Sequence, residues 1–134
     1  MKNIMYCLVV VFLFVISPSV FADNFTQQKI GSFDYVNGSN GYSGSGQQIG
    51  STYYYHDNQG NNYTTQRIGS TDYTNGSNGY SGTTQRIGSF DYTNDNQGGS
   101  YSTQQIGQTG YTTGTGGYSG TSQNIGGTTY YNDN

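Results

Sequence analysis

Seven residue types, Cys, Pro, Trp, Leu, Met, Ala and Glu, are missing from residues 23 to 134 of this 134-residue chain. Without Cys, this part of the chain can form neither disulfides nor thiolate metal sites, and it has no cysteine nucleophile. Its aliphatic side chains are only six Ile and one Val. Ordering each residue costs roughly 1 to 2 kcal/mol of backbone entropy, and burial of seven aliphatic side chains, at roughly 1.5 to 3 kcal/mol each, cannot offset this cost. An ordinary aliphatic core is therefore excluded, and the 14 Tyr of this part must supply most of the apolar surface.

Charged side chains are also scarce. Residues 23 to 134 hold one Lys, two Arg, seven Asp and one His, His56, which gives a net charge of −4 with His neutral. Nucleic-acid binding needs clustered cations, so we expect no nucleic-acid partner. A Ser nucleophile needs a positioned base, and residues 23 to 134 offer a single His in a predicted loop and no Glu. We therefore expect no catalytic residue and no enzyme activity. We also expect no cofactor and no metal site. Asp57 and Asp95 open D-N-Q-G loops, which predict turns rather than calcium sites because spaced carboxylates are missing.

Residues 1 to 22 differ in kind from the rest. Lys2 precedes an apolar run over residues 4 to 16, and Val20 and Ala22 are small residues suited to a cleavage site. The run is too short to span a bilayer comfortably. This arrangement predicts a signal peptide over residues 1–22, so we expect the membrane to be a partner only during export. The protein is then secreted, to the extracellular space or the cell surface, with the periplasm as the alternative.

Residues 23–134 form one predicted domain of tandem repeats. The dipeptide Ile-Gly recurs six times, once in every nineteen residues, with Gln two residues before each Ile and Tyr five residues after it. Such exact spacing predicts a repeat architecture. We expect these positions to be structural: Gln28, Ile30, Tyr35, Gln47, Ile49, Tyr54, Gln66, Ile68, Tyr73, Gln85, Ile87, Tyr92, Gln104, Ile106, Tyr111, Gln123, Ile125 and Tyr130.

A longer period, which spans a pair of units, overlies the first. A second Tyr follows the repeat Tyr after seven residues in units one, three and five, and after nine residues in units two and four. The intervening loops of six and eight residues alternate, as expected where successive turns lie at opposite edges of a meander. The second Tyr residues are candidates for a surface that binds a partner: Tyr42, Tyr63, Tyr80, Tyr101 and Tyr118.

Each unit predicts one strand and one turn. The strand is a stretch of about 12 to 14 residues rich in Thr, Tyr, Ile and Phe that runs through Ile-Gly, and the turn is rich in Gly, Asn, Asp and Ser. We predict an all-β fold in which six 19-residue repeats form an antiparallel up-and-down meander after the N-terminal signal helix. The alternative is a parallel β-solenoid with one unit per coil.

Alternation along such a strand places Ile and Gln on one face and the Tyr residues on the other. In this arrangement Tyr35 faces Tyr42 across the loop, and aromatic pairs of this kind stabilise a sheet. The sheet also has two free edges, which no Pro and few cations protect against pairing with other chains.

The Q-x-I-G-x-x-x-Y-x5-G pattern over residues 28 to 131 resembles that of short exported bacterial tandem-repeat proteins, largely uncharacterised, with Ile-Gly-x-x-x-Tyr units. In design alone it also resembles the curli-type amyloid subunits, which use tandem units of similar length with fixed Gln and Gly positions. Here Ile49-Gly50 and Tyr54 stand where curli units have internal Gln-x-Gly and Asn-x-Ala. The resemblance implies an extracellular fibre or surface component.

Two functions follow from this reasoning. The first is a secreted, non-enzymatic structural protein that assembles with itself into an extracellular fibre or matrix through its sheet edges and Tyr face. The alternative is an exported module that binds polysaccharide or a cell surface through its Tyr rows, because exposed rings stack on sugar faces.

Overall fold

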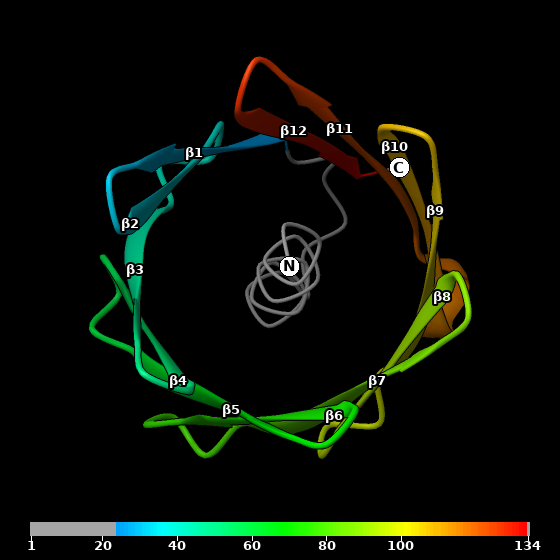
Figure 1. Cartoon of the computed structure of the whole chain (residues 1–134), viewed down its shortest axis with the longest axis horizontal. Helices are drawn as coiled ribbons and strands as arrows, with labels where there is room; N and C mark the ends of the chain where they lie inside the picture. The colour runs from blue at the N-terminus through cyan, green and yellow to red at the C-terminus, as the bar shows by residue number, and fades with distance from the viewer. Residues whose placement is uncertain (1–23, 134) are drawn as a thin grey trace.

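The structure, a computed structural model, describes residues 24–133; the predicted signal peptide at residues 1–22 lies outside them. These residues form twelve antiparallel strands, each paired with the next along the chain, and β1 (Asn24–Ile30) also pairs with β12 (Thr128–Asp133). Figure 1 views the resulting closed ring of strands end-on. The predicted all-β, antiparallel up-and-down fold is confirmed, whereas the alternative of a parallel solenoid is wrong.

The remaining strands are β2 (Phe33–Gly38), β3 (Ser43–Ile49), β4 (Thr52–Asp57), β5 (Asn62–Ile68), β6 (Thr71–Gly76), β7 (Ser81–Ile87), β8 (Phe90–Asp95), β9 (Ser100–Ile106), β10 (Thr109–Gly114) and β11 (Ser119–Ile125). A short 3₁₀ turn over Thr115–Gly117 joins β10 to β11. Within residues 24–133, no helix is long and apolar enough to cross a membrane.

Each repeat unit contributes two strands, so the expectation of one long strand through Ile-Gly is wrong. Each strand that enters this motif ends at Ile, and the following Gly has a positive φ, for example +63° at Gly31. Gly adopts this left-handed conformation at little cost, and two-residue hairpin turns require it. The repeated Gly is therefore a turn, and six two-residue turns lie at one end of the barrel, which we call the turn end.

The opposite end, which we call the loop end, holds five loops, the start of β1 and the end of β12. All five loops are four residues long, so the predicted alternation of loop lengths is also wrong. Tyr spacing alternates for a different reason. Tyr42, Tyr80 and Tyr118 are the last residues of their loops, whereas Tyr63 and Tyr101 lie within strands.

The two-residue turn also decides which side chains share a face. Ile30 is the cross-strand partner of Phe33, and Gln28 is the partner of Tyr35. Partners in an antiparallel pair point to the same side of the sheet. The repeated Ile, Gln and Tyr therefore all face outward, and the prediction that Ile and Tyr occupy opposite faces is wrong.

One set of inward-facing aromatic side chains repeats once in every two units. In each such pair of units a strand aromatic meets the loop Tyr edge-on: Phe25 with Tyr42, Tyr63 with Tyr80, and Tyr101 with Tyr118, at ring-centroid distances of 6.1, 6.3 and 5.8 Å. Each strand aromatic lies opposite a Gly, and a Cβ added at Gly76 would lie 2.7 Å from Tyr63 Cε1. This aromatic pair therefore occurs three times around the inner wall, once in every second hairpin.

Asp57 and Asp95 take the turn-forming role that the sequence predicts. Asp57 Oδ1 accepts hydrogen bonds from the backbone N–H groups of Gln59 and Asn61, at 3.0 and 2.8 Å. Asp95 Oδ1 accepts the equivalent bonds at 2.9 and 2.7 Å. Each carboxylate therefore satisfies loop backbone that has no strand partner.

Candidate functional site

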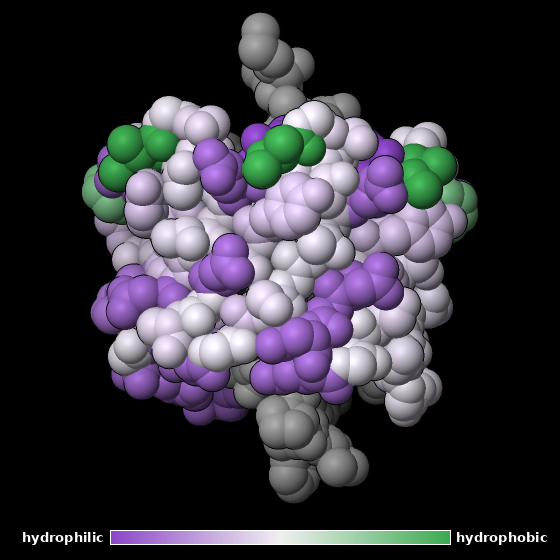
Figure 2. All heavy atoms as spheres, turned by 90° about the horizontal axis from the view of Figure 1, so that it is seen from below, coloured by the Kyte–Doolittle hydropathy of each residue, from purple (hydrophilic) through white to green (hydrophobic). Residues whose placement is uncertain are grey.

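The first candidate site encircles the outer wall. It consists of the six Ile, each 56 to 61% exposed, the six Tyr five residues after them, each 41 to 49% exposed, and the six Gln opposite those Tyr. We call this set the Ile–Tyr belt. Figure 2 shows its most hydrophobic side chains near one end of the barrel, separated by more polar ones. Every residue predicted as structural lies in this belt, so the sequence identified the belt but not its exposure.

The belt repeats at every second strand. Neighbouring strands lie roughly 4.8 Å apart, so equivalent Ile residues recur at intervals of roughly 10 Å around the ring. Phe33 and Phe90 extend the apolar surface at two of the turns, where they pair with Ile30 and Ile87. The outer wall therefore presents six similar sites, whereas the aromatic pairs of the inner wall occur three times.

All Lys, Arg and Asp residues within 24–133 occupy inward-facing positions of the strands, and this part of the chain has no Glu. Arg67 donates to Asp72 through Nε at 2.8 Å, and Arg86 donates to Asp91 through Nε and Nη2, at 2.8 Å each. Lys29 and Asp34 are cross-strand partners in the same layer. The outer wall of the described residues consequently carries no charged Lys, Arg, Asp or Glu side chain.

The five Tyr predicted to form a binding surface lie on the inside. Tyr42, Tyr63 and Tyr80 are 4, 1 and 2% exposed, and Tyr101 and Tyr118 are half-buried. They therefore do not form an exterior surface. Three of them are loop residues that fold over the end of the barrel, and the other two occupy inward-facing positions of strands. The inward direction of these positions follows only once the turn at Ile-Gly is known.

Burial controls the ionisation of this inner aromatic layer. It raises the pKa of Tyr42, Tyr55 and Tyr80 well above the ordinary value, with neighbouring Asp carboxylates adding to the shift. The hydroxyls of Tyr42 and Tyr55 lie 2.8 Å apart. Burial also raises the pKa of Asp34, although Lys29 and a 3.2 Å hydrogen bond from Tyr53 partly offset this effect. The buried Tyr rings therefore form a core in which the hydroxyl groups are un-ionised at neutral pH.

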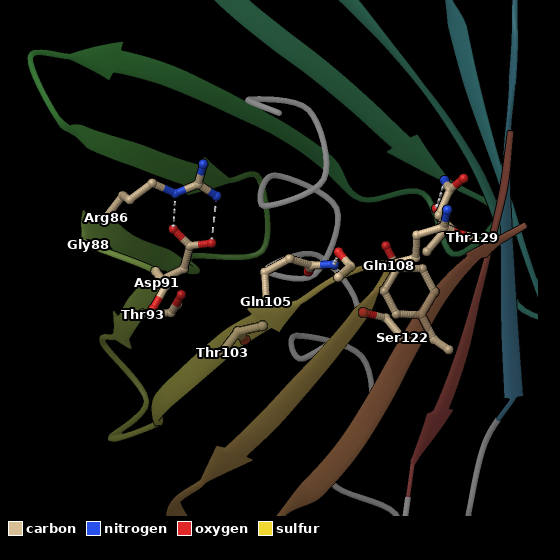
Figure 3. Close-up of a pocket in the computed structure, with 13 residues that line it drawn as sticks. Arg86, Gly88, Asp91, Thr93, Thr103, Gln105, Gln108, Ser122 and Thr129 are labelled. Atoms are coloured by element: carbon tan, nitrogen blue, oxygen red, sulfur yellow. Dashed lines mark hydrogen bonds and ion pairs between the residues drawn. The ribbon is translucent and has the colours of Figure 1, made fainter. Parts of the chain in front are cut away.

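The second candidate site is a cavity of about 460 Å³ on the inner wall of β7–β12, at the turn end. Its lining includes Arg86, Asp91, Gln105, Ser122 and Asn124. In Figure 3, Gln105 and Thr103 lie on the same strand between the Arg86–Asp91 pair and the β11–β12 hairpin. Gly88 and Gln108 come from turns, so the cavity reaches the end of the barrel. This cavity was not predicted from the sequence.

The remaining features to consider are the side chains that could bind a metal ion or take part in acid–base chemistry. Within residues 24–133, no group of three or more His, Cys, Asp or Glu side chains is placed to hold a metal ion. His56 is exposed at the outer wall, where its Nδ1 lies 2.8 Å from Asn62 Oδ1.

Comparison with known proteins adds no relative to this picture: no protein-family model, curated protein or solved structure matches the chain.

Proposed function

We propose that this chain is an exported, non-enzymatic structural protein whose barrels associate side by side with further copies, through the Ile–Tyr belt, into an extracellular or cell-surface matrix. The observation that supports this most strongly is the combination of an uncharged outer wall with a belt of half-exposed Ile and Tyr. Charged surfaces keep proteins apart in solution, and this outer wall has no such repulsion between neighbours.

The route of association differs from the one that the sequence suggests. The expectation of two free sheet edges is wrong, because β1 and β12 pair with each other. A closed barrel has no unpaired strand to template another. Association of folded barrels into a larger assembly therefore depends on contacts between side chains of the outer wall.

The strength of one such contact decides the type of assembly. Burying an exposed Ile or aromatic side chain fully is worth roughly 1.5 to 3 kcal/mol. Because the belt side chains are about half exposed, covering one Ile and one Tyr on each of two barrels returns about 4 kcal/mol. Association itself costs roughly 4 to 15 kcal/mol. A single contact is thus too weak for a stable dimer, whereas several simultaneous contacts around the ring support a cooperative assembly.

Sedimentation velocity and electron microscopy of the protein purified after export test this proposal. We expect monomers at low concentration and large lateral assemblies above a threshold concentration. Replacing the six belt Ile by Thr, a residue already present on the outer wall, should preserve the fold and abolish assembly. The matched control replaces the outward Asn37, Asn75 and Asn94, outside the belt, by Ser and should assemble like the parent.

Two results would overturn the proposal: a parent protein that remains monomeric at high concentration, or an Ile-to-Thr variant that assembles as readily as the parent. Circular dichroism of each variant separates loss of assembly from loss of fold.

A second candidate function is carbohydrate binding by the belt. Each half-exposed belt Tyr lies opposite a Gln, for example Tyr73 opposite Gln66, and a ring beside an amide offers both a stacking surface and hydrogen-bonding groups for a sugar. A monomeric protein that binds insoluble polysaccharide, and loses this binding when the belt Tyr are replaced by Thr, would favour this function over self-assembly.

A further inference from the structure

The last two repeat units depart from the others on the inner wall of the turn end. The inward residue four positions after each repeated Ile is Asp34, Tyr53, Asp72 or Asp91 in the first four units. In units five and six the same position holds Gly110 and Thr129.

The inward position just before Ile changes as well. It holds Lys29, Arg67 and Arg86 in units one, three and four, but Gln105 and Asn124 in units five and six. Arg67 and Arg86 form ion pairs with the Asp four positions after Ile. Units five and six therefore place smaller, uncharged groups where units three and four place ion pairs.

The cavity lies where these smaller residues occur. Its volume of about 460 Å³ falls within the range of roughly 300 to 1,000 Å³ that is typical of small-molecule sites. Arg86 and Asp91 form one side, and Gln105, Ser122 and Asn124 line the wall beyond them. A polar cavity of this size is suited to water or to a polar ligand rather than to an apolar one.

The charge of the lining selects against ions. Arg86 and Asp91 form a two-pronged pair with both donor–acceptor distances at 2.8 Å, and the other side chains from residues 24–133 that line the cavity are uncharged. A ligand with a net charge would lose its hydration without gaining an opposite charge that is not already paired. The cavity therefore favours a neutral ligand.

The hydrogen bonds of the lining indicate what that ligand must offer. Gln105 Nε2 donates to the carbonyl of Gly107 at 3.2 Å, and Asn124 Nδ2 donates to Thr129 Oγ1 at 3.1 Å. Both side chains still have a carbonyl oxygen able to accept, and the Ser122 hydroxyl is able to donate or accept. Several acceptors around a neutral cavity suit a ligand with several O–H donors.

We infer that this cavity binds a neutral saccharide of one or two sugar units. Sugar hydroxyls can donate hydrogen bonds to the side-chain carbonyl oxygens of Gln105 and Asn124, and they can accept a hydrogen bond from the hydroxyl of Ser122. The inference is independent of assembly through the belt, because the cavity faces inward and the belt faces outward.

Isothermal titration calorimetry tests the site with four probes: glucose, N-acetylglucosamine and the β1,4-linked disaccharides cellobiose and chitobiose. The decisive variant is Gln105→Ala, and Gln48→Ala is its matched control. Gln48 has the same repeat position and the same local bond, from Nε2 to the carbonyl of Gly50 at 2.8 Å, but it does not line the cavity. We expect Gln105→Ala to weaken binding roughly three- to tenfold, as loss of one hydrogen bond does, and Gln48→Ala to leave binding unchanged.

A second variant fills the cavity with an Arg–Asp ion pair like the one that another repeat unit carries at the same positions. Asn124 and Thr129 are cross-strand partners, so Asn124→Arg with Thr129→Asp reproduces the pair formed by Arg86 and Asp91. We expect this variant to keep its circular dichroism and melting temperature and to lose saccharide binding.

Three results would overturn the inference. These are no heat of binding with any of the four probes, equal effects of Gln105→Ala and Gln48→Ala, or undiminished binding by the filled variant. A fourth result, obtained with glucose 6-phosphate as a charged fifth probe, would also overturn it: tighter binding of glucose 6-phosphate than of glucose would contradict the neutral character of the site.

Discussion

Two Tyr residues of one hairpin provide a sharp test of the inward and outward faces. Tyr63 on β5 is 1% exposed, and its ring packs against Tyr55 and Tyr80 at centroid distances of 6.3 Å each. Its hydroxyl accepts a hydrogen bond of 3.0 Å from Asn78. Tyr73 on β6 belongs to the belt and is 43% exposed. Replacing each Tyr by Ala therefore removes the same side chain from two different environments.

The buried ring is the costly one. Truncating a buried large aromatic to Ala typically costs about 3 to 5 kcal/mol, so we expect a loss of that size for Tyr63→Ala. Tyr73→Ala removes a side chain that is only about half covered, so we expect a loss of about 1 kcal/mol. For a domain of this size each kcal/mol lowers the melting temperature by about 4 °C, which gives a difference between the two variants of roughly 8 to 16 °C.

Thermal and urea unfolding of both variants, followed by far-ultraviolet circular dichroism, measure this difference. The assay requires concentrations below the threshold for assembly, because association would stabilise the folded state. Equal losses, or a larger loss for Tyr73→Ala, would refute the assignment of faces and restore the pattern in which all Tyr share one side of the sheet.

Three further predictions use other features of the barrel. Gly76→Ala should cost about 1 to 3 kcal/mol, because the new Cβ meets the Tyr63 ring at 2.7 Å in a packed wall; an unchanged urea midpoint would contradict this. Ile68→Ala should cost under about 1 kcal/mol, because Ile68 is 61% exposed, and a loss typical of a core residue would show that the belt is buried. Raising the pH above about 10 should destabilise the fold by roughly 1.4 kcal/mol per pH unit for each deeply buried Tyr, because their raised pKa values let the unfolded state ionise first. Stability should be flat in pH just below that value, and phenolate absorbance should then rise together with unfolding; full ionisation of a protein that stays folded would contradict this. The deeply buried Tyr with a raised pKa include Tyr42, Tyr53, Tyr55, Tyr63 and Tyr80.

The class of fold was predictable from the spacing and the side-chain types. Exact recurrence of Ile-Gly with Thr- and Tyr-rich flanks indicates short strands in a regular array. The longer period of two units also proved meaningful, since it marks the hairpins in which Tyr63 and its counterparts cover a Gly.

The turn at Ile-Gly was not predicted, and this single error separated the repeated Tyr from the Ile and Gln with which they share a face. A Gly inside an otherwise strand-like stretch fits either a strand or a turn. Because side chains alternate with a period of two, a two-residue turn at Gly31 brings Ile30 and Tyr35 to the same face. A signal was present in the sequence: Gly follows each of the six Ile of the repeats without exception, as a conformation restricted to Gly requires.

Closure of the sheet depends on geometry that local sequence does not carry. It follows from the number of strands, their twist and the stagger between them, and six long strands were expected where twelve short ones form. The cavity has a visible signal, the loss of Asp at Gly110 and Thr129. Its meaning requires knowing that both positions face inward.

Closure of the barrel is the central claim, and a disulfide between the first and last strands tests it most directly. Thr26 and Tyr130 are outward-facing partners in the β1–β12 ladder, where Cα atoms lie roughly 4.5 to 5.5 Å apart, and this separation suits a disulfide. In an open meander of twelve strands, β1 and β12 would lie roughly 50 Å apart. Residues 23 to 134 contain no native Cys that would compete.

The measurement is non-reducing electrophoresis and mass spectrometry of the Thr26→Cys, Tyr130→Cys protein after mild oxidation at low concentration. A variant with Thr26→Cys and Thr83→Cys, which places the second thiol on β7 across the ring, serves as control and should remain unbridged. A closed barrel predicts rapid and complete formation of an intramolecular disulfide in the first variant. Free thiols, or disulfides only between molecules, would contradict closure and indicate an open sheet with exposed edges.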